Sequence, residues 1–512
     1  MFAKAYSAAT AGIDAYIVEV EVDITDKGLP RFDMVGLPDA AVKESKERVR
    51  TSIENTDFNF PEARITINLA PADTRKEGPS FDLPMALGML AAMNEIDLRA
   101  WEDIVFIGEL SLDGRLRPVS GVLPVTLAVR DNPALKGIVL PEANAREASL
   151  VDNVEIYPAS TLEDVVLFIE DKKPIAPHPN DGFEQLGTAP AIDADFSEVK
   201  GQEHAKRALE IAAAGNHNVI MIGPPGGGKT MLAKRLPGIL PGLSREEALE
   251  VTKLYSIAGH LRAGQQLLRT RPFRAPHHTI SNVALIGGGP VPKPGEVSLS
   301  HHGVLFLDEL TEFKRDVLEV LRQPLEDRTV TIARAQSTIT FPASFVLIAA
   351  MNPCPCGWYG DYVHPCTCNP TQIQRYMKKI SGPLMDRIDI HIEVPRLETD
   401  KLMSQPSGES SDVIRARADE ARDRQLRRYA EEPIFSNSEL NARMMREYCV
   451  LPTEAEDLLK SAIKKLGYTA RAYDRIRKLS RTIADLAGRD SIGVEDVAEA
   501  ITLRSLDRKY MS

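Results

Sequence analysis

The octapeptide at residues 223–230, Gly-Pro-Pro-Gly-Gly-Gly-Lys-Thr, restricts the fold of this 512-residue chain more than any other segment. It has the GxxxxGK(S/T) spacing of a phosphate-binding loop, which functions between a strand and a helix. The apolar run 218–222 supplies the strand, and 231–236 opens a helix that stops at Pro237. The sequence therefore predicts an α/β fold with an ATP site formed by Gly223, Pro224, Pro225, Gly226, Gly227, Gly228, Lys229 and Thr230.

The residue types in this loop explain how it would hold a nucleotide. Glycines let backbone N–H groups surround the phosphates, and the start of the following helix adds a favourable dipole. Lys229 is expected to reach the β- and γ-phosphates, and Thr230 offers its hydroxyl to Mg²⁺.

Polar residues follow two further apolar runs. Asp308 and Glu309 directly follow the apolar run 303–307, and Asn352 closely follows the run 344–350. Ligands bind at the carboxyl ends of parallel strands, so these side chains are expected near the phosphate loop. Asp308 is predicted to hold Mg²⁺, Glu309 to polarise the attacking water, and Asn352 to hydrogen-bond the γ-phosphate or that water.

This order of phosphate loop, acidic strand and polar strand end resembles the AAA+ ATPases, in which Asn352 takes the sensor-1 position. Arg387, in the segment 381–389, matches the arginine that reaches the neighbouring subunit's ATP in this branch; an ordinary surface arginine is the alternative. An arginine that acts in trans requires an oligomer. Arg471 matches the sensor-2 arginine of the helical lid, and Arg475, one turn later, competes with it.

Composition favours a large intracellular protein. The hydrophobic content of 43% is sufficient for two or three domain cores. No apolar run approaches the ~18 residues that span a membrane, and the first residues lack a secretory signal. The sequence therefore predicts a cytoplasmic location without membrane attachment.

Proline-rich and flexible segments divide the chain. We expect an N-terminal domain at residues 1–170, a proline-rich linker at 171–195 and an AAA+ core at 196–398 that contains a cysteine-rich loop at 353–369. Residues 399–512 would form a helical lid domain.

The N-terminal domain alternates strands, at 15–22 and 63–69, with helices such as 82–92. Its segments 76–83 and 106–118 resemble the Lon-protease domain, which implies a ribosomal-S5-domain-2-like α/β fold. Ser80 falls at the Lon nucleophile position, whereas Leu123 occupies the position of the lysine base. Because a serine without a base is a poor nucleophile, we expect no peptidase activity.

Two CxC pairs lie in the cysteine-rich loop. Four thiolates on one short loop suit a tetrahedral Zn²⁺ site, with His364 as a substitute ligand; reduced or redox-active thiols are the alternative. The aromatic residues of the same loop would stack on unpaired bases or pack over the metal. The candidate zinc ligands are Cys354, Cys356, Cys366 and Cys368.

The chain has a net charge of −11, yet residues 251–295 and 328–360 contain no Asp or Glu. Acid-free segments in an acidic chain are typical of a surface that contacts the phosphate backbone of DNA. A surface that faces ATP or an adjacent subunit is the alternative. The basic residues of the first segment are Lys253, Arg262, Arg269, Arg271, Arg274 and Lys293.

From end to end, the chain resembles the ComM (YifB) family of magnesium-chelatase-like AAA+ proteins. The resemblance implies that the lid at 399–512 is of the magnesium-chelatase C-terminal type. Besides the Lon-like segment and the phosphate loop, the resemblance is carried by residues 271–278, 285–289, 294–299, 384–389 and 481–486.

The resemblance implies a ring, expected to be a hexamer, that translocates single-stranded or branched DNA. It also implies branch migration during recombination of incoming DNA in natural transformation. The family's helix-2 insert would be 279–298 and its pre-sensor hairpin 329–341, both directed towards the ring's pore. Lys293, Arg334 and Gln336 are therefore the candidate DNA contacts.

Two rival functions use the same motor. A magnesium-chelatase subunit would drive metal insertion into a porphyrin, but the chelatase ATPase subunit lacks a Lon-like domain. An ATP-dependent peptidase would need the lysine that Leu123 replaces.

Overall fold

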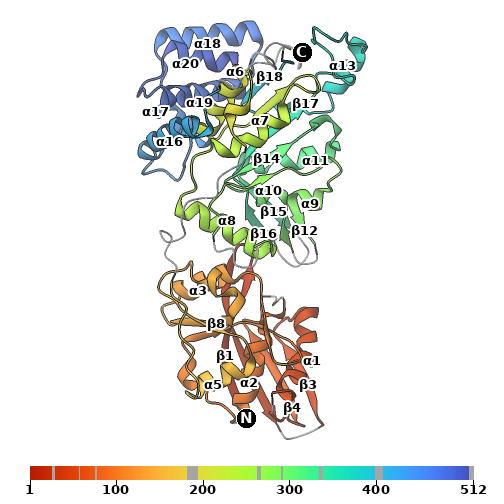
Figure 1. Ribbon diagram of the computed structural model, residues 1–512, viewed down its shortest axis with the longest axis vertical. Helices are drawn as coiled ribbons and strands as arrows, with labels where there is room; N and C mark the ends of the chain where they lie inside the picture. Colours follow the sequence, from red (N-terminus) through yellow and green to blue (C-terminus); the bar gives the residue numbers. More distant parts are fainter. Residues whose placement is uncertain are drawn as a thin grey trace.

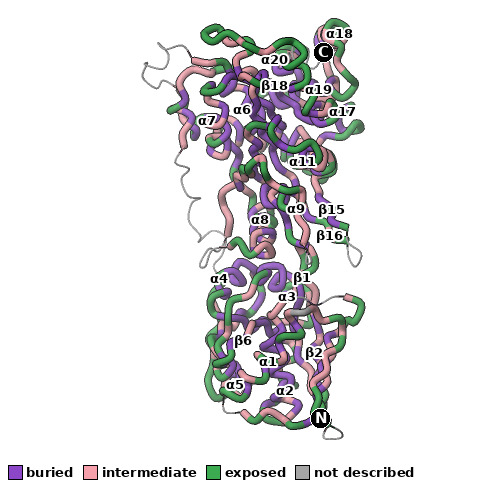
Figure 2. Tube along the Cα trace, turned by 90° about the vertical axis from the view of Figure 1, so that its right-hand side faces the viewer, coloured by how far each residue is buried: buried purple, intermediate pink, exposed green. Residues whose placement is uncertain are grey.

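The computed structural model describes residues 1–25, 29–56, 58–74, 76, 78–180, 194–261, 267–289, 292–333, 338–397, 408–504 and 506. The molecule is elongated, with the N-terminal α/β body at one end and the C-terminal helices at the other (Figure 1). Buried backbone is concentrated inside each body (Figure 2). No helix within the described ranges is long and apolar enough to cross a membrane.

The N-terminal body is built on a mixed seven-stranded sheet. Strand β2 places Val18, Val20, Val22 and Ile24 on one face, all 2% exposed or less, as its alternating sequence predicts. Helix α2 (Asp82–Ala92), apolar on nearly every side, packs on β1 and β2. The strand order is β3 (Arg31–Val35), β4 (Arg64–Ala70), β2 (Asp14–Thr25), β1 (Phe2–Ala11), β5 (Ile104–Phe106), β8 (Gly137–Pro141) and β9 (Glu155–Ala159).

The second body contains a five-stranded sheet in which each pair of neighbouring strands is parallel. Its central strands are uninterrupted apolar runs, buried on both faces, as expected for a parallel sheet covered by helices. Because the strands are parallel, all their carboxyl ends lie at one edge of the sheet. The order is β11 (Phe273–Arg274), β14 (Val304–Leu307), β17 (Val346–Met351), β10 (Val219–Ile222) and β18 (Ile390–Glu393).

Two small hairpins extend from this body. Strands β12 (Gly287–Gly288) and β13 (Lys293–Pro294) form one, beside the short helix α9 (Asn282–Ile286). Strands β15 (Thr329–Ala333) and β16 (Thr338–Pro342) form the other, in which Ala333 pairs with Thr338. The hairpin expected at 329–341 is thus confirmed, while Arg334 and Gln336 lie outside the described residues.

The C-terminal residues are helical, as the family resemblance implies. Helix α19 packs on α20 and α16, and also on α6 (Glu203–Gly215) of the second body. Its Arg481 is almost fully buried and donates to the carbonyl groups of Asp490 and Arg489 at 2.7 and 2.6 Å. These contacts satisfy a charge that would otherwise be costly to bury. The helices are α16 (Ser411–Arg428), α17 (Ala442–Tyr448), α18 (Thr453–Leu466), α19 (Ala470–Leu486) and α20 (Val494–Thr502).

Helix α8 (Arg245–Ala258) joins the two α/β bodies by packing against α3 (Val122–Asp131). At this junction the buried Glu147 carboxylate accepts hydrogen bonds from the Ser256 hydroxyl at 2.5 Å and the Leu123 amide at 2.9 Å. Burial raises the pKa of Glu147. Because a buried carboxylate needs its hydrogen-bond partners, Glu147 favours one placement of the N-terminal body on helix α8.

Candidate nucleotide-binding site

The phosphate loop connects β10 to helix α7 (Lys229–Arg235). Gly226 and Gly228 have φ values of 78° and 92°, which only glycine adopts without strain. A Cβ atom on Gly223 would collide with the Val394 carbonyl oxygen. The loop therefore needs its glycines for left-handed turns and for close packing against the segment that follows β18.

Lys229 lies inside this loop. Its Nζ donates to the carbonyl oxygens of Gly223 and Pro224, at 2.8 and 2.9 Å, and to Asn352 Oδ1 at 3.3 Å. Burial lowers the pKa of the Lys229 ammonium to about 8, against the opposing effect of Asp308 and Glu309. An ammonium in this position is suited to phosphate oxygens, whose negative charge would offset its loss of solvation.

The side chains expected to hold Mg²⁺ meet directly. The Thr230 hydroxyl donates to Asp308 Oδ2 at 2.6 Å, and the other Asp308 oxygen accepts from the Glu309 amide at 2.9 Å. Hydroxyl and carboxylate oxygens are the hard ligands that Mg²⁺ prefers, so the donor set fits the ion.

Glu309 occupies an unusual backbone position. It has φ 51° and ψ 48°, a left-handed conformation that is uncommon for residues other than glycine and is concentrated at functional sites. Its side chain is 59% exposed, with Oε2 3.6 Å from His278 Nδ1. His278 belongs to an acid-free segment and to the 271–278 segment of the family resemblance, but no catalytic role was predicted for it. Its position beside the Glu309 carboxylate suits it to orient the predicted base.

The predicted arginines lie at the opposite edge of the sheet. Arg387 precedes β18, whereas Lys229 follows the parallel strand β10. The four residues of β18 span about 13 Å at the usual rise per residue. Arg471 lies on the same side as Arg387, with Nη1 3.8 Å from Asp386 Oδ2. Arg387 and Arg471 therefore both lie away from Lys229 of the same chain. For Arg471, the order of the strands alone did not predict this position.

Arg387 is buried in the wall of a cleft of about 660 Å³. It donates from Nη1 to the Pro383 carbonyl at 2.8 Å and forms an ion pair with Glu326. Its Nε has no hydrogen-bond acceptor among the described residues. Arg387 is thus buried and ion-paired, and its action on a neighbouring subunit's ATP stays a prediction.

Arg475, the competitor of Arg471, has a different environment. Its Nε donates to the Asp386 carbonyl at 3.0 Å, and its Nη1 pairs with the buried Asp389. Asp389 also receives the Asn218 amide at 2.9 Å. Arg475 thus ties the helical lid to the sheet, and the more exposed Arg471 remains the better sensor-2 candidate.

Several cations of the first acid-free segment are paired with acids from elsewhere. Arg271 pairs with Glu247 at 2.9 Å, and Arg274 with Glu296 at 2.6 Å. Lys253 lies 3.7 Å from Asp14 of the N-terminal body. A stretch of sequence without acids is therefore not a surface without acids. Lys293, on β13, is exposed.

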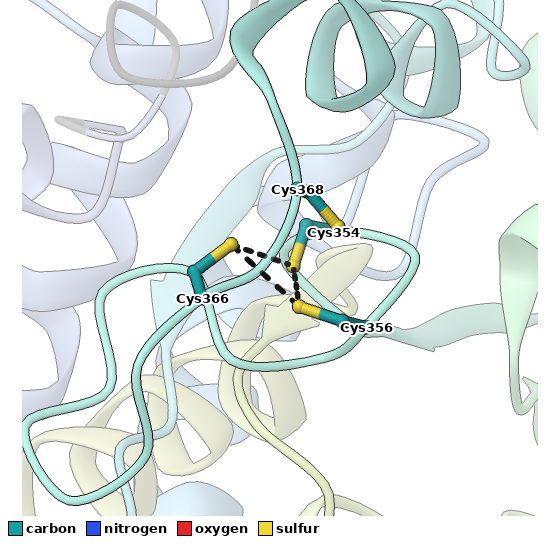
Figure 3. Close-up of side chains that lie close together, drawn as sticks. All are labelled: Cys354, Cys356, Cys366 and Cys368. Atoms are coloured by element: carbon teal, nitrogen blue, oxygen red, sulfur yellow. Dashed lines mark hydrogen bonds between the residues drawn. The ribbon is translucent and has the colours of Figure 1, made fainter.

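The four loop cysteines converge (Figure 3). The Cys354 sulfur lies 3.3 Å from that of Cys356 and 3.7 Å from that of Cys366, and the last two are 3.6 Å apart. The Cys368 sulfur lies within 4.8 Å of the other three. Tetrahedral Zn²⁺ with Zn–S bonds of about 2.3 Å separates its sulfur ligands by about 3.8 Å, so the spacing fits this ion.

Glu250, His301 and His302 form another compact cluster of metal-type side chains. His301 Nδ1 accepts the Ser344 amide at 3.0 Å, which places the ring proton of a neutral His301 on Nε2, 3.0 Å from Glu250 Oε2. A metal-ligating histidine instead donates from the nitrogen that is not bound to the metal. This cluster is therefore a hydrogen-bonded network that supports helix α8.

The positions equivalent to the Lon catalytic residues lie in separate environments. Ser80 lies in the short helix η1 (Pro79–Phe81), and Leu123 is fully buried near the junction with α8. The nearby Lys76 is also buried, and its Nζ donates to the carbonyl groups of Thr74, at 2.8 Å, and Pro71. Its ammonium is thus engaged by backbone oxygens.

The parallel sheet, the phosphate loop and the adjacent carboxylates define an AAA+ ATPase of the magnesium-chelatase type. Family models described as magnesium chelatase, subunit ChlI, match residues 195–402 and, for its C-terminal part, residues 408–504. A third, described as subunit ChlI of Mg-chelatase, matches residues 20–144.

Full-length relatives narrow this assignment. The competence protein ComM of Haemophilus influenzae is 44% identical over 512 residues, covering 98% of this chain and 97% of the relative. The YifB protein of Escherichia coli K12 is 42% identical over 507 residues, with the same coverage of both chains. The chain belongs to the ComM/YifB family of magnesium-chelatase-like AAA+ ATPases. Lon protease 2 of Bacillus subtilis is 27% identical over 165 residues, 29% of each chain, in agreement with a Lon-like part.

Proposed function

We propose that this protein is a ring-shaped DNA motor that couples ATP hydrolysis to branch migration in the recombination of incoming DNA. The observation that supports the proposal is that the residues predicted for the ATP site lie at two opposite edges of one sheet. Lys229, Asp308 and Asn352 lie at the carboxyl edge, and Arg387 and Arg471 lie at the other. Such a site is completed when a neighbouring subunit supplies its arginines.

Hydrolysis would use each residue at a defined point. Lys229 and the loop amides hold the phosphates, and Thr230 and Asp308 hold Mg²⁺, which neutralises phosphate charge. The half-exposed Glu309 orients the attacking water, with His278 restraining its carboxylate from 3.6 Å.

Arg387 would act on the neighbouring subunit's ATP. It lines a cleft together with the insert helix α9, and its buried Nε has no hydrogen-bond acceptor among the described residues. Arginine forms strong charge-assisted hydrogen bonds with phosphate oxygens. Arg471, beside Asp386, would serve as sensor 2 in trans from the same edge. A hexameric ring in the cytoplasm is the assembly that we propose.

The proposed DNA contacts are Lys293, Arg334 and Gln336. Lys293 is exposed on the β12–β13 hairpin of the insert, and the other two belong to the turn between β15 and β16, outside the described residues. Support comes from the name of the Haemophilus relative, a competence protein.

The motor is tested by ATP turnover and branch migration. We expect single-stranded or four-way-junction DNA to stimulate turnover, and the protein to move a labelled junction only with hydrolysable ATP. Glu309→Gln is the inactive control. If no form of DNA changed the rate of ATP turnover and the labelled junction did not move, the DNA motor would be refuted. The ATPase assignment would remain.

We also propose that Cys354, Cys356, Cys366 and Cys368 bind one Zn²⁺, because their sulfur spacing approaches a tetrahedral set. Elemental analysis of the purified chain should find one zinc per subunit. Cys366→Ser with Cys368→Ser should abolish it, whereas Cys449→Ser, at a buried cysteine of the helical lid, should not.

The proposed domain limits are 1–170, 196–398 and 399–512, with a linker at 171–195. The N-terminal domain would be non-proteolytic, because Leu123 is buried and Lys76 is held by backbone carbonyls. Casein that stays intact in the presence of ATP is the expected result; cleavage abolished by Ser80→Ala would contradict it.

A further inference from the structure

The cysteine loop begins next to Asn352, a residue predicted for the ATP site. Cys354 follows Asn352 by two positions at the end of β17, and its side chain is fully buried. Asn352 Oδ1 accepts the Lys229 ammonium at 3.3 Å. The backbone of Asn352 is thus held on one side by β17 and on the other by a cysteine of the cluster.

The loop then packs on the phosphate loop itself. Gly357, next to Cys356, has φ 87°, and a Cβ atom there would lie 2.8 Å from Pro225 Cδ and 2.9 Å from Cγ. The Gly357 backbone therefore lies directly against the proline ring. Cys354 and Cys356 thus lie beside the two points at which this loop contacts the ATP site.

A third contact reaches the segment after β18, which packs against the phosphate loop. The Arg396 guanidinium lies 5.5 Å from the centre of the Trp358 ring, and the Tyr362 hydroxyl donates to the Arg396 carbonyl at 3.0 Å. Just before Arg396, the Pro395 carbonyl accepts a hydrogen bond from Gln202 at 2.7 Å, and the same Gln202 amide donates to Gly227 at 3.2 Å.

Much of the loop lies away from the core. Tyr359, Tyr362 and Val363 are 38%, 64% and 53% exposed. A short loop with so little buried apolar surface depends on its cross-link for a fixed shape, and a structural metal provides one. The four sulfur atoms bring the two ends of the loop together, Cys354 and Cys356 with Cys366 and Cys368.

We propose that a metal ion on the four cysteines acts as a clamp on the ATP site. The bound ion fixes Asn352, Gly357 and the segment 394–396 against the phosphate loop, and loss of the ion slows ATP hydrolysis without unfolding the domains. This inference rests on the zinc site and the ATPase activity proposed above. Displacement of a catalytic group by about 1 Å can cost on the order of 10²-fold in rate.

The first experiment removes the metal from the full-length protein. A zinc-selective chelator is added in excess Mg²⁺, and zinc content, ATP turnover, MgATP affinity by calorimetry and circular dichroism are followed together. We expect turnover to fall by about 10- to 100-fold, with helix content retained, and to return when Zn²⁺ is added back. The Cys449→Ser variant should respond in the same way as the unmodified chain, because its cysteine lies outside the cluster.

A second variant tests the contact without touching a ligand. Gly357→Ala should keep one zinc per subunit but lower turnover or MgATP affinity, because its Cβ would press on Pro225. Gly360→Ala is the matched control for backbone strain, since Gly360 has φ 82° in the same loop. We expect Gly360→Ala to retain zinc and activity.

The outcomes separate the inference from its premises. Stoichiometric zinc whose removal leaves both turnover and MgATP affinity unchanged overturns the clamp alone. A protein that hydrolyses ATP but holds no zinc overturns the zinc site and the clamp together. A zinc-loaded protein without turnover contradicts the ATPase proposal. In that case, weaker MgATP binding after metal removal supports the clamp, and unchanged MgATP binding overturns it.

Discussion

At the scale of single residues, Lys229 shows how burial tunes the ATP site. Its ammonium is enclosed by the carbonyl groups of Gly223 and Pro224, and burial lowers its pKa to about 8. The phosphates of ATP favour the charged form, so the nucleotide-bound protein holds this proton to higher pH than the free protein does.

The affinity for MgATP should therefore fall as pH rises above about 8, by up to tenfold per pH unit, because binding then requires uptake of a proton. Below that pH the affinity should be nearly constant with respect to this group. Calorimetry between pH 7 and 9.5 measures both limits. Lys229→Arg, which stays charged throughout, should lose the dependence; an unchanged profile in that variant would assign the titration to another group.

Glu309 and Lys229 should have separable roles. Glu309→Gln should retain MgATP but lower turnover by ~10²-fold or more, because the amide cannot act as a base. Lys229→Ala should lose nucleotide affinity, since it removes the ammonium that contacts the loop and Asn352. Binding and single-turnover measurements distinguish the two. Turnover of Glu309→Gln at the rate of the unmodified chain would show that another group activates the water.

At the scale of elements, the central strands were predictable because buried parallel strands are short apolar runs bounded by glycine and polar residues. The positions of Lys229, Asp308 and Asn352 were predictable for the same reason, because each lies shortly after one of those strands. Contacts between elements that are distant in the sequence could not be predicted. The ion pair of Arg387 with Glu326 joins residues 61 positions apart, and Gly357 meets Pro225 through the fold of the cysteine loop. Arg271 and Arg274 lie in an acid-free segment, yet the fold supplies each with a glutamate.

The β12–β13 hairpin carries the element-scale prediction, because Lys293 is exposed on it while the paired cations of the same segment are occupied. Lys293→Ala should weaken DNA binding and reduce the slope of log affinity against log salt by roughly one unit. Basal turnover and ring size should stay unchanged. Lys136→Ala, at a 73%-exposed lysine of the N-terminal body, is the control. An unaltered salt slope in Lys293→Ala would remove this hairpin from the proposed DNA surface.

At the scale of the whole molecule, the N-terminal body is attached to the ATPase body through helix α8. Glu147 links the α3 amide of Leu123 to Ser256, and an ion pair between Arg245 and Asp152 adds to the junction. The N-terminal body is thus fastened to the element that precedes the insert, so we expect the two α/β bodies to move together in a ring.

The proposed division of the ATP site between two subunits makes a prediction that only an assembly can satisfy. Neither Arg387→Ala nor Glu309→Gln rings should hydrolyse ATP efficiently, because every site lacks its arginine or its base. Random mixing of the two subunits in equal amounts should restore about a quarter of the sites, since each needs an intact Glu309 on one side and an intact Arg387 on the other. Steady-state turnover across mixing ratios, with mixed rings verified by mass, measures this recovery.

Arg387→Ala should remain folded, because its partner Glu326 is 57% exposed and stays hydrated. Mixing Glu309→Gln with Lys229→Ala is the matched control: both changes lie on the same side of the site, so no mixture should recover. Equal recovery in the two mixtures, or none in either, would place Arg387 outside the neighbouring subunit's ATP site.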